Sequence, residues 1–238
     1  MDQRTLVRQI FATTGRSYDF MVKAATLWQD DSWKKRILDI SGQIAPQTIL
    51  DLACGTGILT FALAKKFPES TIVGIDLQEE YLGYARAKKI KNDVKNVEFF
   101  ERNAEDVIEG EYDLITASYL PKYVDIDIVI GTCSKILNPG GLLIFHDFTY
   151  PENAIYRFSY NVYWAFLKSI LWMSESWREM SKELKGIIVK THWVNDMKNA
   201  LETHGFTDIH VEIQPLEVAA IVYAIKNGTV HRPTPTLL

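Results

Sequence analysis

A short apolar strand that runs into a glycine turn constrains the fold of this 238-residue chain more than any other feature. Residues 48–53 (TILDLA) are mostly apolar, Gly55 and Gly57 follow, and residues 58–66 (ILTFALAKK) have the composition of a helix. Such an apolar run, bounded by turn signals, predicts a strand buried on both faces of a parallel sheet. Glycine lets the turn backbone take positive φ and approach a ligand closely. The motif predicts an α/β fold with a ligand site at this strand end.

Strand and helix patterns alternate along the chain at the spacing of a doubly wound sheet. Two patterns near the end, residues 207–213 and 216–225, are too close for a parallel crossover and are expected to pair as a hairpin. The predicted fold is α/β: a doubly wound, mainly parallel seven-stranded sheet with a C-terminal antiparallel hairpin, N-terminal helices and a helical insertion after the fifth strand. The other predicted strands are 71–75, 96–100, 112–117 and 141–148, and the helices between them are 79–91 and 125–137.

Polar side chains stand at the ends of four successive predicted strands. Asp51 is placed to accept hydrogen bonds from a ligand ammonium, and the helix start after Gly57 suits a carboxylate. Asp76 ends the second strand, where an acidic side chain binds ribose hydroxyls in this fold. Proteins that bind NAD use an acid at that position too, but their glycine fingerprint needs a third glycine where Thr60 stands. The third and fourth strand ends carry Asn103-Ala104-Glu105-Asp106 and Thr116-Ala117-Ser118-Tyr119.

These motifs resemble those of class I S-adenosylmethionine-dependent methyltransferases. Over roughly residues 7–226 the chain is similar to the ubiquinone/menaquinone biosynthesis C-methyltransferases. The similarity is carried by Ile10-Phe11, Ser17-Tyr18-Asp19, Trp33-Lys34, Asp51 to Gly57, Asn103-Ala104-Glu105, Leu137-Asn138-Pro139-Gly140-Gly141, Phe148 to Pro151 and Ala219 to Tyr223. It implies S-adenosyl-L-methionine as methyl donor and S-adenosyl-L-homocysteine as product. The candidate cofactor contacts are Tyr18, Asp51, Ala53, Gly55, Thr56, Gly57, Asp76, Leu77, Asn103, Ala104, Glu105 and Ser118.

The catalytic candidates follow the fourth and fifth strands. In-line methyl transfer mainly needs alignment, and a base or positive neighbour helps when the acceptor is a ring carbon. The candidates are Tyr119, Lys122, His146 and Asp147, with Tyr150 nearby. The quinone enzymes usually carry an arginine-asparagine pair after the fourth strand, where this chain has Lys122-Tyr123, and a glutamate at the position of Asp147. Because side chains alternate along a strand, we expect only one of His146 and Asp147 to face the cleft.

An aromatic block after the fifth strand bears on the methyl acceptor. Such a wall suits an apolar, planar acceptor, although packing within the domain or a homodimer contact also accounts for it. The expected function is C-methylation of a quinone precursor such as demethylmenaquinone. The alternatives are methylation of another lipid or small metabolite, a non-catalytic partner that retains the cofactor fold, and an NAD-dependent reductase. The block comprises Tyr150, Tyr156, Phe158, Tyr160, Tyr163, Trp164, Phe166, Trp172 and Trp177.

Net charge, cysteine spacing and the length of the apolar runs limit which partners the protein can bind and where in the cell it is expected. A net charge of −4 argues against a nucleic-acid partner, because phosphate contact favours a basic face. The two cysteines, Cys54 and Cys133, lack metal-ligand spacing, so no metal is predicted. The most apolar run, residues 162–173, is too short to span a bilayer and contains Lys168. We expect a cytoplasmic protein with peripheral membrane contact.

The length fits a single domain over residues 1–238. A helical pattern covers residues 4–41 with a break at Gly15, and residues 152–185 are helical in character. A final helix over 192–204 has Thr191 as its expected N-cap and Gly205 as its stop. The expected parts are N-terminal helices (1–45), the cofactor-binding core (46–150), an aromatic helical cover (151–190), the final helix and hairpin (191–226) and a loose tail (227–238).

Overall fold

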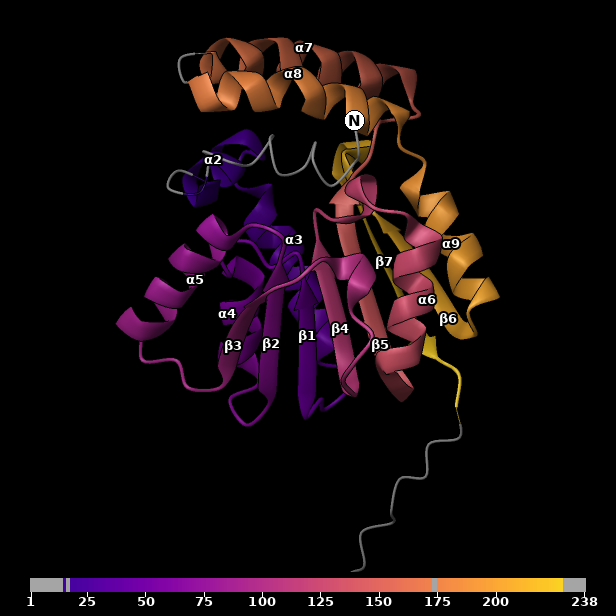
Figure 1. Cartoon of the computed structure of the whole chain (residues 1–238). Coiled ribbons are helices and arrows are strands. Elements are labelled where there is room, and N and C mark those ends of the chain that lie inside the picture. Colours follow the sequence, from indigo (N-terminus) through magenta and orange to yellow (C-terminus); the bar gives the residue numbers. More distant parts are fainter. Residues whose placement is uncertain (1–14, 16–17, 173–174, 229–238) are drawn as a thin grey trace, which may run out of the picture.

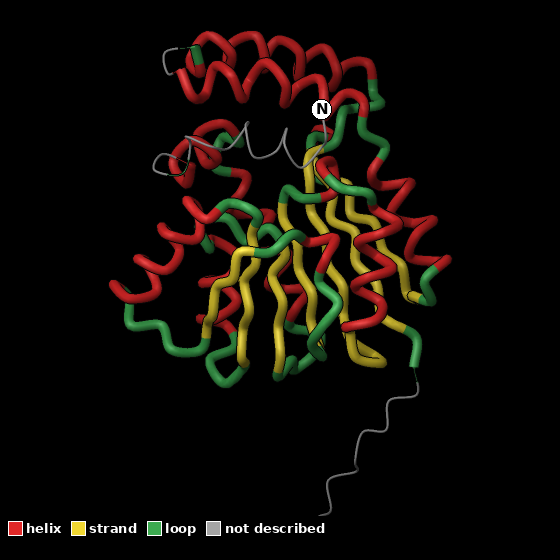
Figure 2. Tube along the Cα trace, in the orientation of Figure 1, coloured by secondary structure: helices red, strands yellow, loops and turns green. Residues whose placement is uncertain are grey.

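The computed structural model describes residues 15, 18–172 and 175–228, and its ribbon is a sheet between two layers of helices (Figure 1, Figure 2). Among these residues, seven strands form one sheet in the order β3-β2-β1-β4-β5-β7-β6. The first five strands pair in parallel, and β7 is antiparallel to both β5 and β6. The predicted fold class is therefore confirmed. The strands are β1 (Thr48–Leu52), β2 (Thr71–Asp76), β3 (Val97–Glu101), β4 (Tyr112–Ser118), β5 (Leu137–Phe148), β6 (Phe206–Ile213) and β7 (Ala219–Lys226).

Helices cover both faces of the sheet, because its strands are apolar on both sides. Along β5, Leu142 and Ile144 join one core, whereas Leu143 and Phe145 join the other, as the two-residue period of a strand requires. The first core is closed by α3 (Gln29–Ser41), α4 (Ile58–Lys66) and α5 (Glu79–Lys91), and the second by α6 (Ile126–Ile136) and α9 (Trp193–Thr203).

The start of β5 differs from the prediction. The sequence predicts a helix that ends at residue 137 and a strand that begins at residue 141, but the strand begins at Leu137. The reason is that Leu137 pairs with Tyr112 of β4 before the register shifts between Tyr112 and Leu114. The glycine-containing run is thus a bulge inside the strand, with Gly140 at a φ of +76°.

The C-terminal hairpin is confirmed, and its largest boundary shift is at the start of the second strand. β7 begins at Ala219 rather than at residue 216. Leu216 and Glu217 have φ values of +61° and +57°, so they cannot continue a strand.

The last helix keeps its predicted stop but not its predicted N-cap. Gly205 follows α9 at a φ of +78°. The N-cap is His192 and not Thr191, so the predicted N-cap is wrong by one residue. The hydroxyl of Thr191 still accepts a hydrogen bond from the backbone N–H of Trp193, at 3.3 Å, which accounts for the signal.

The N-terminal helical pattern contains a second break. Helix α2 (Tyr18–Ala25) ends before α3, and between them Leu27 and Trp28 take φ values of +51° and +61°. The prediction of one helical stretch broken only at Gly15 is therefore wrong within the described residues. Residues 4–14, with the Ile10-Phe11 motif, and Ser17 lie outside these residues, as do positions 229–238 of the predicted tail.

The insertion after β5 forms two helices, α7 (Ala154–Leu171) and α8 (Glu175–Lys190). The Asn153 side chain caps α7 by accepting from the N–H of Ile155 at 2.9 Å. The two helices lie over the end of the sheet that also carries α2 (Figure 1). Within the described residues, no helix is both long enough and apolar enough to cross a membrane.

Candidate functional site

Two adjoining cavities lie at the carboxyl ends of β1, β2 and β4, beneath α2. The main cavity has a volume of about 240 Å³ and the side cavity about 30 Å³. Six residues line both cavities: Tyr18, Val22, Ala53, Gly55, Ser118 and Tyr119. All of the candidate cofactor contacts except Gly57 line one or both cavities. Positions that are far apart in the sequence, most of them at predicted strand ends, therefore lie together in the structure. The main cavity holds Tyr18, Ala53, Gly55, Asp76, Leu77, Asn103, Ala104, Glu105 and Ser118, and the side cavity adds Asp51 and Thr56.

The turn after β1 is held in positive φ at three positions. Ala53, Gly55 and Gly57 have φ values of +51°, +56° and +84°. A side chain tolerates this region poorly, so Ala53 stores strain at the cavity wall. Gly57 also lacks space, because a Cβ there would lie 2.7 Å from the ring of Phe61. Gly57 thus shapes the start of α4 without lining a cavity.

Replacing Gly57 with alanine is expected to destabilise the fold by about 1–3 kcal/mol, through the left-handed backbone and the clash with Phe61. Urea unfolding measures the change. Gly83, in α5, is the matched control because a Cβ there meets nothing within 4 Å. Gly83→Ala should stabilise by about 0.5–1 kcal/mol, since alanine favours a helix. Equal losses in both variants would contradict this reading of the turn.

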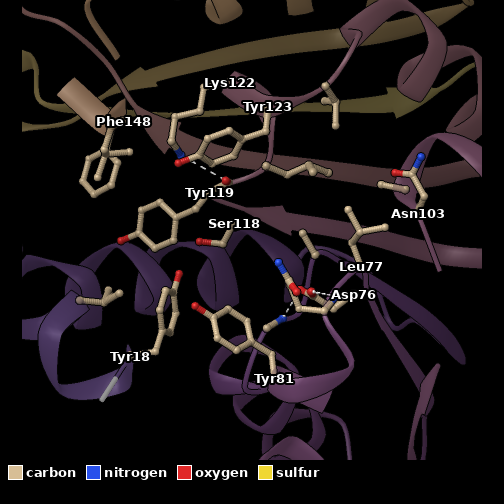
Figure 3. Close-up of a pocket in the computed structure, with 18 of the residues that line it drawn as sticks. Tyr18, Asp76, Leu77, Tyr81, Asn103, Ser118, Tyr119, Lys122, Tyr123 and Phe148 are labelled. Atoms are coloured by element: carbon tan, nitrogen blue, oxygen red, sulfur yellow. Dashed lines mark hydrogen bonds between the residues drawn. The ribbon is translucent and has the colours of Figure 1, made fainter. Parts of the chain in front are cut away.

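Asp76 ties the glycine turn to the next strand. Its two carboxylate oxygens accept from the backbone N–H groups of Gly55 and Gln78, both at 2.8 Å. Burial raises the pKa of Asp76 to about 6, although these bonds oppose the shift. The side chain lines the main cavity (Figure 3), so its remaining lone pairs can meet a ligand.

Asp51 sits at the floor of the side cavity, under the turn. Its oxygens accept from the hydroxyls of Thr60 at 2.6 Å and Thr116 at 2.8 Å. Burial raises its pKa to about 6, against these two bonds and the nearby positive charge of Lys34. Lys34 comes from α3 and also lines the side cavity. An acid and a cation therefore face the same small space, as an amino-acid group requires.

Helix α2 is fastened over the turn by polar contacts. Thr56 donates its hydroxyl to Asp19, and Lys88 of α5 pairs with the same carboxylate. Lys88 also donates to the backbone carbonyl of Thr56, at 3.1 Å. The rings of Tyr18 and Tyr81 lie 5.1 Å apart at the centroids and face the main cavity (Figure 3). The cavity is thus covered by α2 and walled by aromatic rings.

The far end of the main cavity is formed after β2 and β3. Leu77, Asn103, Ala104 and Glu105 line it, and Figure 3 shows Asn103 at the opposite end from Phe148. The amide oxygen of Asn103 accepts from the N–H of Glu105 at 3.4 Å, so it caps the short helix that follows β3. A small wall of this kind, with polar groups near an apolar leucine, suits a flat base.

At the other end, Lys122 and Asp147 form a buried ion pair. Their Nζ and Oδ1 atoms are 2.5 Å apart, and Asp147 also accepts from the backbone N–H of Lys122 at 3.1 Å. Burial lowers the pKa of Lys122 and raises that of Asp147, while their attraction opposes both shifts. The ammonium lies 4.3 Å from the ring centroid of Tyr123 and 5.5 Å from those of Tyr119 and Phe148. Lys122 lines the main cavity, whereas Asp147 lies behind it.

Tyr119 stands where the two cavities meet. It has a φ of +67°, and its ring stacks on Phe148 with the centroids 4.8 Å apart. Its hydroxyl donates to Asp30 of α3 at 2.6 Å, and Asp30 also pairs with Lys34. Burial and the negative charge of Asp30 raise the pKa of Tyr119 well above its usual value, so the phenol stays protonated. Its geometry suits ring stacking and not proton abstraction.

His146 belongs to the core behind the cavities. Its Nδ1 lies 2.9 Å from the hydroxyl of Ser118, and its ring lies 5.2 Å from that of Trp33. Burial drives the pKa of His146 well below its usual value, so the ring is neutral. Nε2 has no hydrogen-bond partner among the described residues. His146 and Asp147 point to opposite faces of β5, as strand alternation requires. Neither side chain lines either cavity, so the prediction that one of them faces the cleft is wrong.

Sequence reasoning missed several residues of this site. Tyr81 and Tyr123 line the main cavity, and Asp30 anchors Tyr119. Tyr81 carried a usable signal, because it lies in the first turn of the helix that follows the Asp76 strand end. Asp30 carried no such signal in the sequence, because Tyr119, whose hydroxyl donates to it, is 89 positions away. The described part of the chain contains no cluster of three or more His, Cys, Asp or Glu side chains that could hold a metal ion.

The arrangement agrees with comparisons to known proteins. The model of the ubiE/COQ5 methyltransferase family matches residues 1–226. The chain belongs to this family. A demethylmenaquinone methyltransferase of Lactococcus lactis subsp. lactis is 31% identical over 161 residues, covering 66% of this chain and 64% of that protein, less than two thirds of its length. A Thermus thermophilus protein of the same name is 29% identical over 157 residues, covering 65% of this chain and 71% of that protein.

Solved structures support the fold of this ubiE/COQ5 family member. The magnesium protoporphyrin IX methyltransferase of Synechocystis PCC 6803, with bound S-adenosylhomocysteine, aligns with a TM-score of 0.66 at 18% identity, covering 94% of this chain and 99% of that one. The geranyl diphosphate C-methyltransferase of Streptomyces coelicolor aligns with a TM-score of 0.55 at 11% identity, covering 76% of this chain and 72% of that one. At these identities the likeness concerns the fold alone.

Proposed function

We propose that this chain is an S-adenosylmethionine-dependent methyltransferase that C-methylates a lipophilic quinone precursor such as demethylmenaquinone. One observation carries the proposal. The main cavity joins an end suited to an adenosyl group, with Asp76 beside the glycine turn, to an aromatic end around Tyr119 and Phe148. The adjoining side cavity, lined by Asp51 and Lys34, suits the amino-acid group of the same ligand. Membership of the ubiE/COQ5 family and the names of the relatives support the same function.

The residues of the donor end fit the cofactor. S-adenosylmethionine supplies an electrophilic methyl group carried on a sulfonium. Asp76 would accept the ribose hydroxyls, and Asn103 with Leu77 would bound the adenine. Asp51, Lys34 and the positive end of α4 line or adjoin the side cavity, where the amino-acid group belongs.

The acceptor end would orient a flat ring and stabilise its charge. Tyr119 and Phe148 present stacked rings, against which an aromatic acceptor packs. A hydroquinone carbon becomes nucleophilic when a ring hydroxyl loses its proton. The ammonium of Lys122, held by Asp147 among three aromatic rings, would stabilise the resulting oxyanion. Lys122 would thereby supply positive charge where the related enzymes usually carry arginine.

Two measurements test the function separately. Isothermal titration with S-adenosylhomocysteine should show stoichiometric binding, and absence of heat at saturating ligand would overturn the donor assignment. Incubation with S-adenosylmethionine and demethylmenaquinol, followed by mass spectrometry, should yield a product one methylene heavier. Donor binding without that product, together with a different methylated compound from a membrane lipid extract, would identify another lipid acceptor. The cytoplasmic location and a homodimer contact stay predictions.

Binding of S-adenosylhomocysteine is expected to weaken as the pH falls through about 6. The carboxylate of Asp76 holds the turn and would accept the ribose hydroxyls, and its pKa is about 6. Asp51 titrates near the same value. Affinity should drop by up to about tenfold per pH unit below that point for each carboxylate that must be ionised. Calorimetry between about pH 8 and pH 5 measures the slope.

The free energy of unfolding should depend on pH with the opposite sign to ligand binding. Both carboxyls have a folded pKa above the ordinary value of 3.8. Their contribution to stability is therefore fully present below the unfolded pKa and is lost as the pH rises through about 6. In Asp76→Asn this part of the pH dependence should disappear from both binding and unfolding. An unchanged binding profile in that variant would contradict the role of Asp76.

A further inference from the structure

Asp30, in the first turn of α3, is a buried carboxylate with no assigned role in the proposed methyl transfer. One of its oxygens, Oδ1, accepts from two side chains. The hydroxyl of Tyr119 donates to it at 2.6 Å, and the ammonium of Lys34, one helical turn further along α3, pairs with it. The other oxygen, Oδ2, has no hydrogen-bond partner among the described residues. Asp30 thus joins a residue of α3 to a residue at the end of β4.

Stability alone does not account for a carboxylate at this position. A charge that leaves water loses its hydration, and a buried partner restores only part of that free energy, so apolar side chains of similar volume often serve the fold equally well. The Oδ2 atom of Asp30 adds to the cost, because a buried polar atom without a hydrogen bond is unfavourable. The attraction between Asp30 and the positive start of α3 is small by comparison. The position of Asp30 is therefore better explained by the two side chains that it holds.

The two side chains that Asp30 holds belong to different parts of the site. Lys34 lines the side cavity together with Asp51, where the amino-acid group of the donor is proposed to bind. Tyr119 lines both cavities, and its ring stacks on Phe148 at the acceptor end of the main cavity (Figure 3). The Lys34 ammonium also lies 5.0 Å from the centroid of the Tyr119 ring. One carboxylate oxygen therefore fixes a group of the donor end against a group of the acceptor end.

The place of Tyr119 makes the orientation of its ring matter. A donor whose amino-acid group lies in the side cavity and whose adenosyl group lies in the main cavity spans the junction between them, which Tyr119 lines. The backbone of Tyr119 is strained, with a φ of +67°, and such strain persists only where surrounding contacts hold it. Its hydrogen bond to Asp30 is one of these contacts. Because a misplacement of about 1 Å can cost on the order of 100-fold in rate, a fixed ring at this junction favours methyl transfer.

We propose that Asp30 is a positioning residue that aligns donor and acceptor, because its carboxylate orients both Lys34 at the amino-acid pocket and Tyr119 at the junction of the cavities. This role rests on the proposed function, since it concerns the two reactants of the methyl transfer. Asp30 lines neither cavity, so it acts through these two side chains and not by touching a ligand. Helix α3 suits the role, because Ile37 and Ile40 anchor it in the core and keep the carboxylate in place.

Three substitutions separate the two contacts of Asp30. Tyr119→Phe removes only the hydroxyl, and should lower kcat about tenfold while the affinity for S-adenosylhomocysteine stays within about threefold of the wild type. Asp30→Asn keeps an oxygen that accepts from Tyr119 but removes the charge that holds Lys34. It should weaken that affinity about tenfold with little change in kcat, because Lys34 would turn toward Asp51 and has to be ordered again by the ligand. Asp30→Ala removes both contacts and should show both losses. Titration calorimetry measures the affinity, and product formation from demethylmenaquinol measures kcat.

A double-mutant cycle tests whether Asp30 acts through Tyr119. In the Asp30→Ala background, Tyr119→Phe should cost nothing further in kcat, because the hydroxyl has already lost its acceptor. Losses in kcat that multiply would overturn the assignment. The matched control is Asp39→Asn, which removes the acid of an exposed Asp–Lys pair in the same helix and should match the wild type in kcat and in affinity.

Urea unfolding and the wild-type activity keep the outcomes apart. If Asp30 only stabilises the fold, Asp30→Asn and Tyr119→Phe would lower the unfolding midpoint while kcat and affinity of the folded protein stay at the wild-type level, which would overturn the positioning role. Should Asp30→Ala not fold, the contrast between the affinity loss of Asp30→Asn and the kcat loss of Tyr119→Phe decides. A wild type that binds S-adenosylhomocysteine but methylates no acceptor would overturn the proposed function, and the affinity of Asp30→Asn would then decide the role of Asp30 by itself.

Discussion

Replacing Lys122 with methionine is expected to lower the free energy of unfolding by about 3–5 kcal/mol. The substitution keeps most of the side-chain volume but leaves Asp147 fully buried without its cation. Asp147 would retain only backbone donors, from Lys122 at 3.1 Å and Phe148 at 2.7 Å. Two N–H groups do not replace an ammonium at 2.5 Å in a site that excludes water. Urea unfolding with matched buffers measures the loss.

The pH dependence of that loss identifies its cause. Burial already raises the pKa of Asp147, and Lys122 holds it down. Without Lys122 the folded pKa rises further above the unfolded value, so the contribution of Asp147 is present at low pH and lost as the pH rises through its folded pKa. The deficit of Lys122→Met should therefore shrink in acid. The double variant Lys122→Met/Asp147→Asn, which leaves no buried charge, should recover most of the loss. A deficit that is the same at every pH and in the double variant would contradict the ion-pair account.

Activity separates the electrostatic role of Lys122 from its structural one. If its ammonium stabilises an acceptor oxyanion, the double variant should fold yet lose about 100-fold to 1000-fold in kcat. Its affinity for S-adenosylhomocysteine should stay at the wild-type level, because the pair lies at the acceptor end. Full activity in the folded double variant would remove Lys122 from the proposed mechanism.

The fold and the donor end could be predicted from sequence for a simple topological reason. Parallel strands place all their carboxyl ends at one edge of the sheet, so polar residues at those ends must meet. Asp51, Asp76, Asn103 and Ser118 each follow an apolar run that is visible in the sequence. The residues that line the donor end are thus fixed by local patterns and one global rule.

The acceptor end follows no such rule. Lys122 and Asp147 are 25 positions apart, and their contact depends on how the segment after β4 folds back over β5. The contact between Tyr119 and Asp30 depends on the break between α2 and α3, where no glycine or proline marks the turn. Strain at Leu27 and Trp28 is held by tertiary packing, which single-residue preferences do not encode. Sequence analysis could therefore name Tyr119, Lys122 and Asp147 as candidates after the fourth and fifth strands, but it could not predict the contacts that these side chains make.

Replacing Asp76 with alanine is expected to weaken S-adenosylhomocysteine binding by at least about 100-fold, because two charge-assisted hydrogen bonds to a ligand are together worth more than 2.7 kcal/mol. The same change frees the N–H of Gly55, whose positive φ the carboxylate helps to hold. The glycine turn should therefore lose order as well as a ligand contact. Titration calorimetry measures the affinity, and amide hydrogen exchange at Gly55 measures the turn.

Matched variants distinguish these two effects of Asp76. Asp76→Asn keeps one oxygen acceptor but no charge, so its affinity should fall between those of the wild type and Asp76→Ala. Glu109→Gln removes an exposed carboxylate outside both cavities and should bind like the wild type. If Asp76→Ala binds the ligand normally while Gly55 exchanges fast, Asp76 only anchors the turn. Weak ligand binding with slow exchange at Gly55 would instead mean that Asp76 contacts the ribose alone. Because the carboxylate both lines the cavity and holds the turn, we expect Asp76→Ala to lose ligand affinity and turn order together.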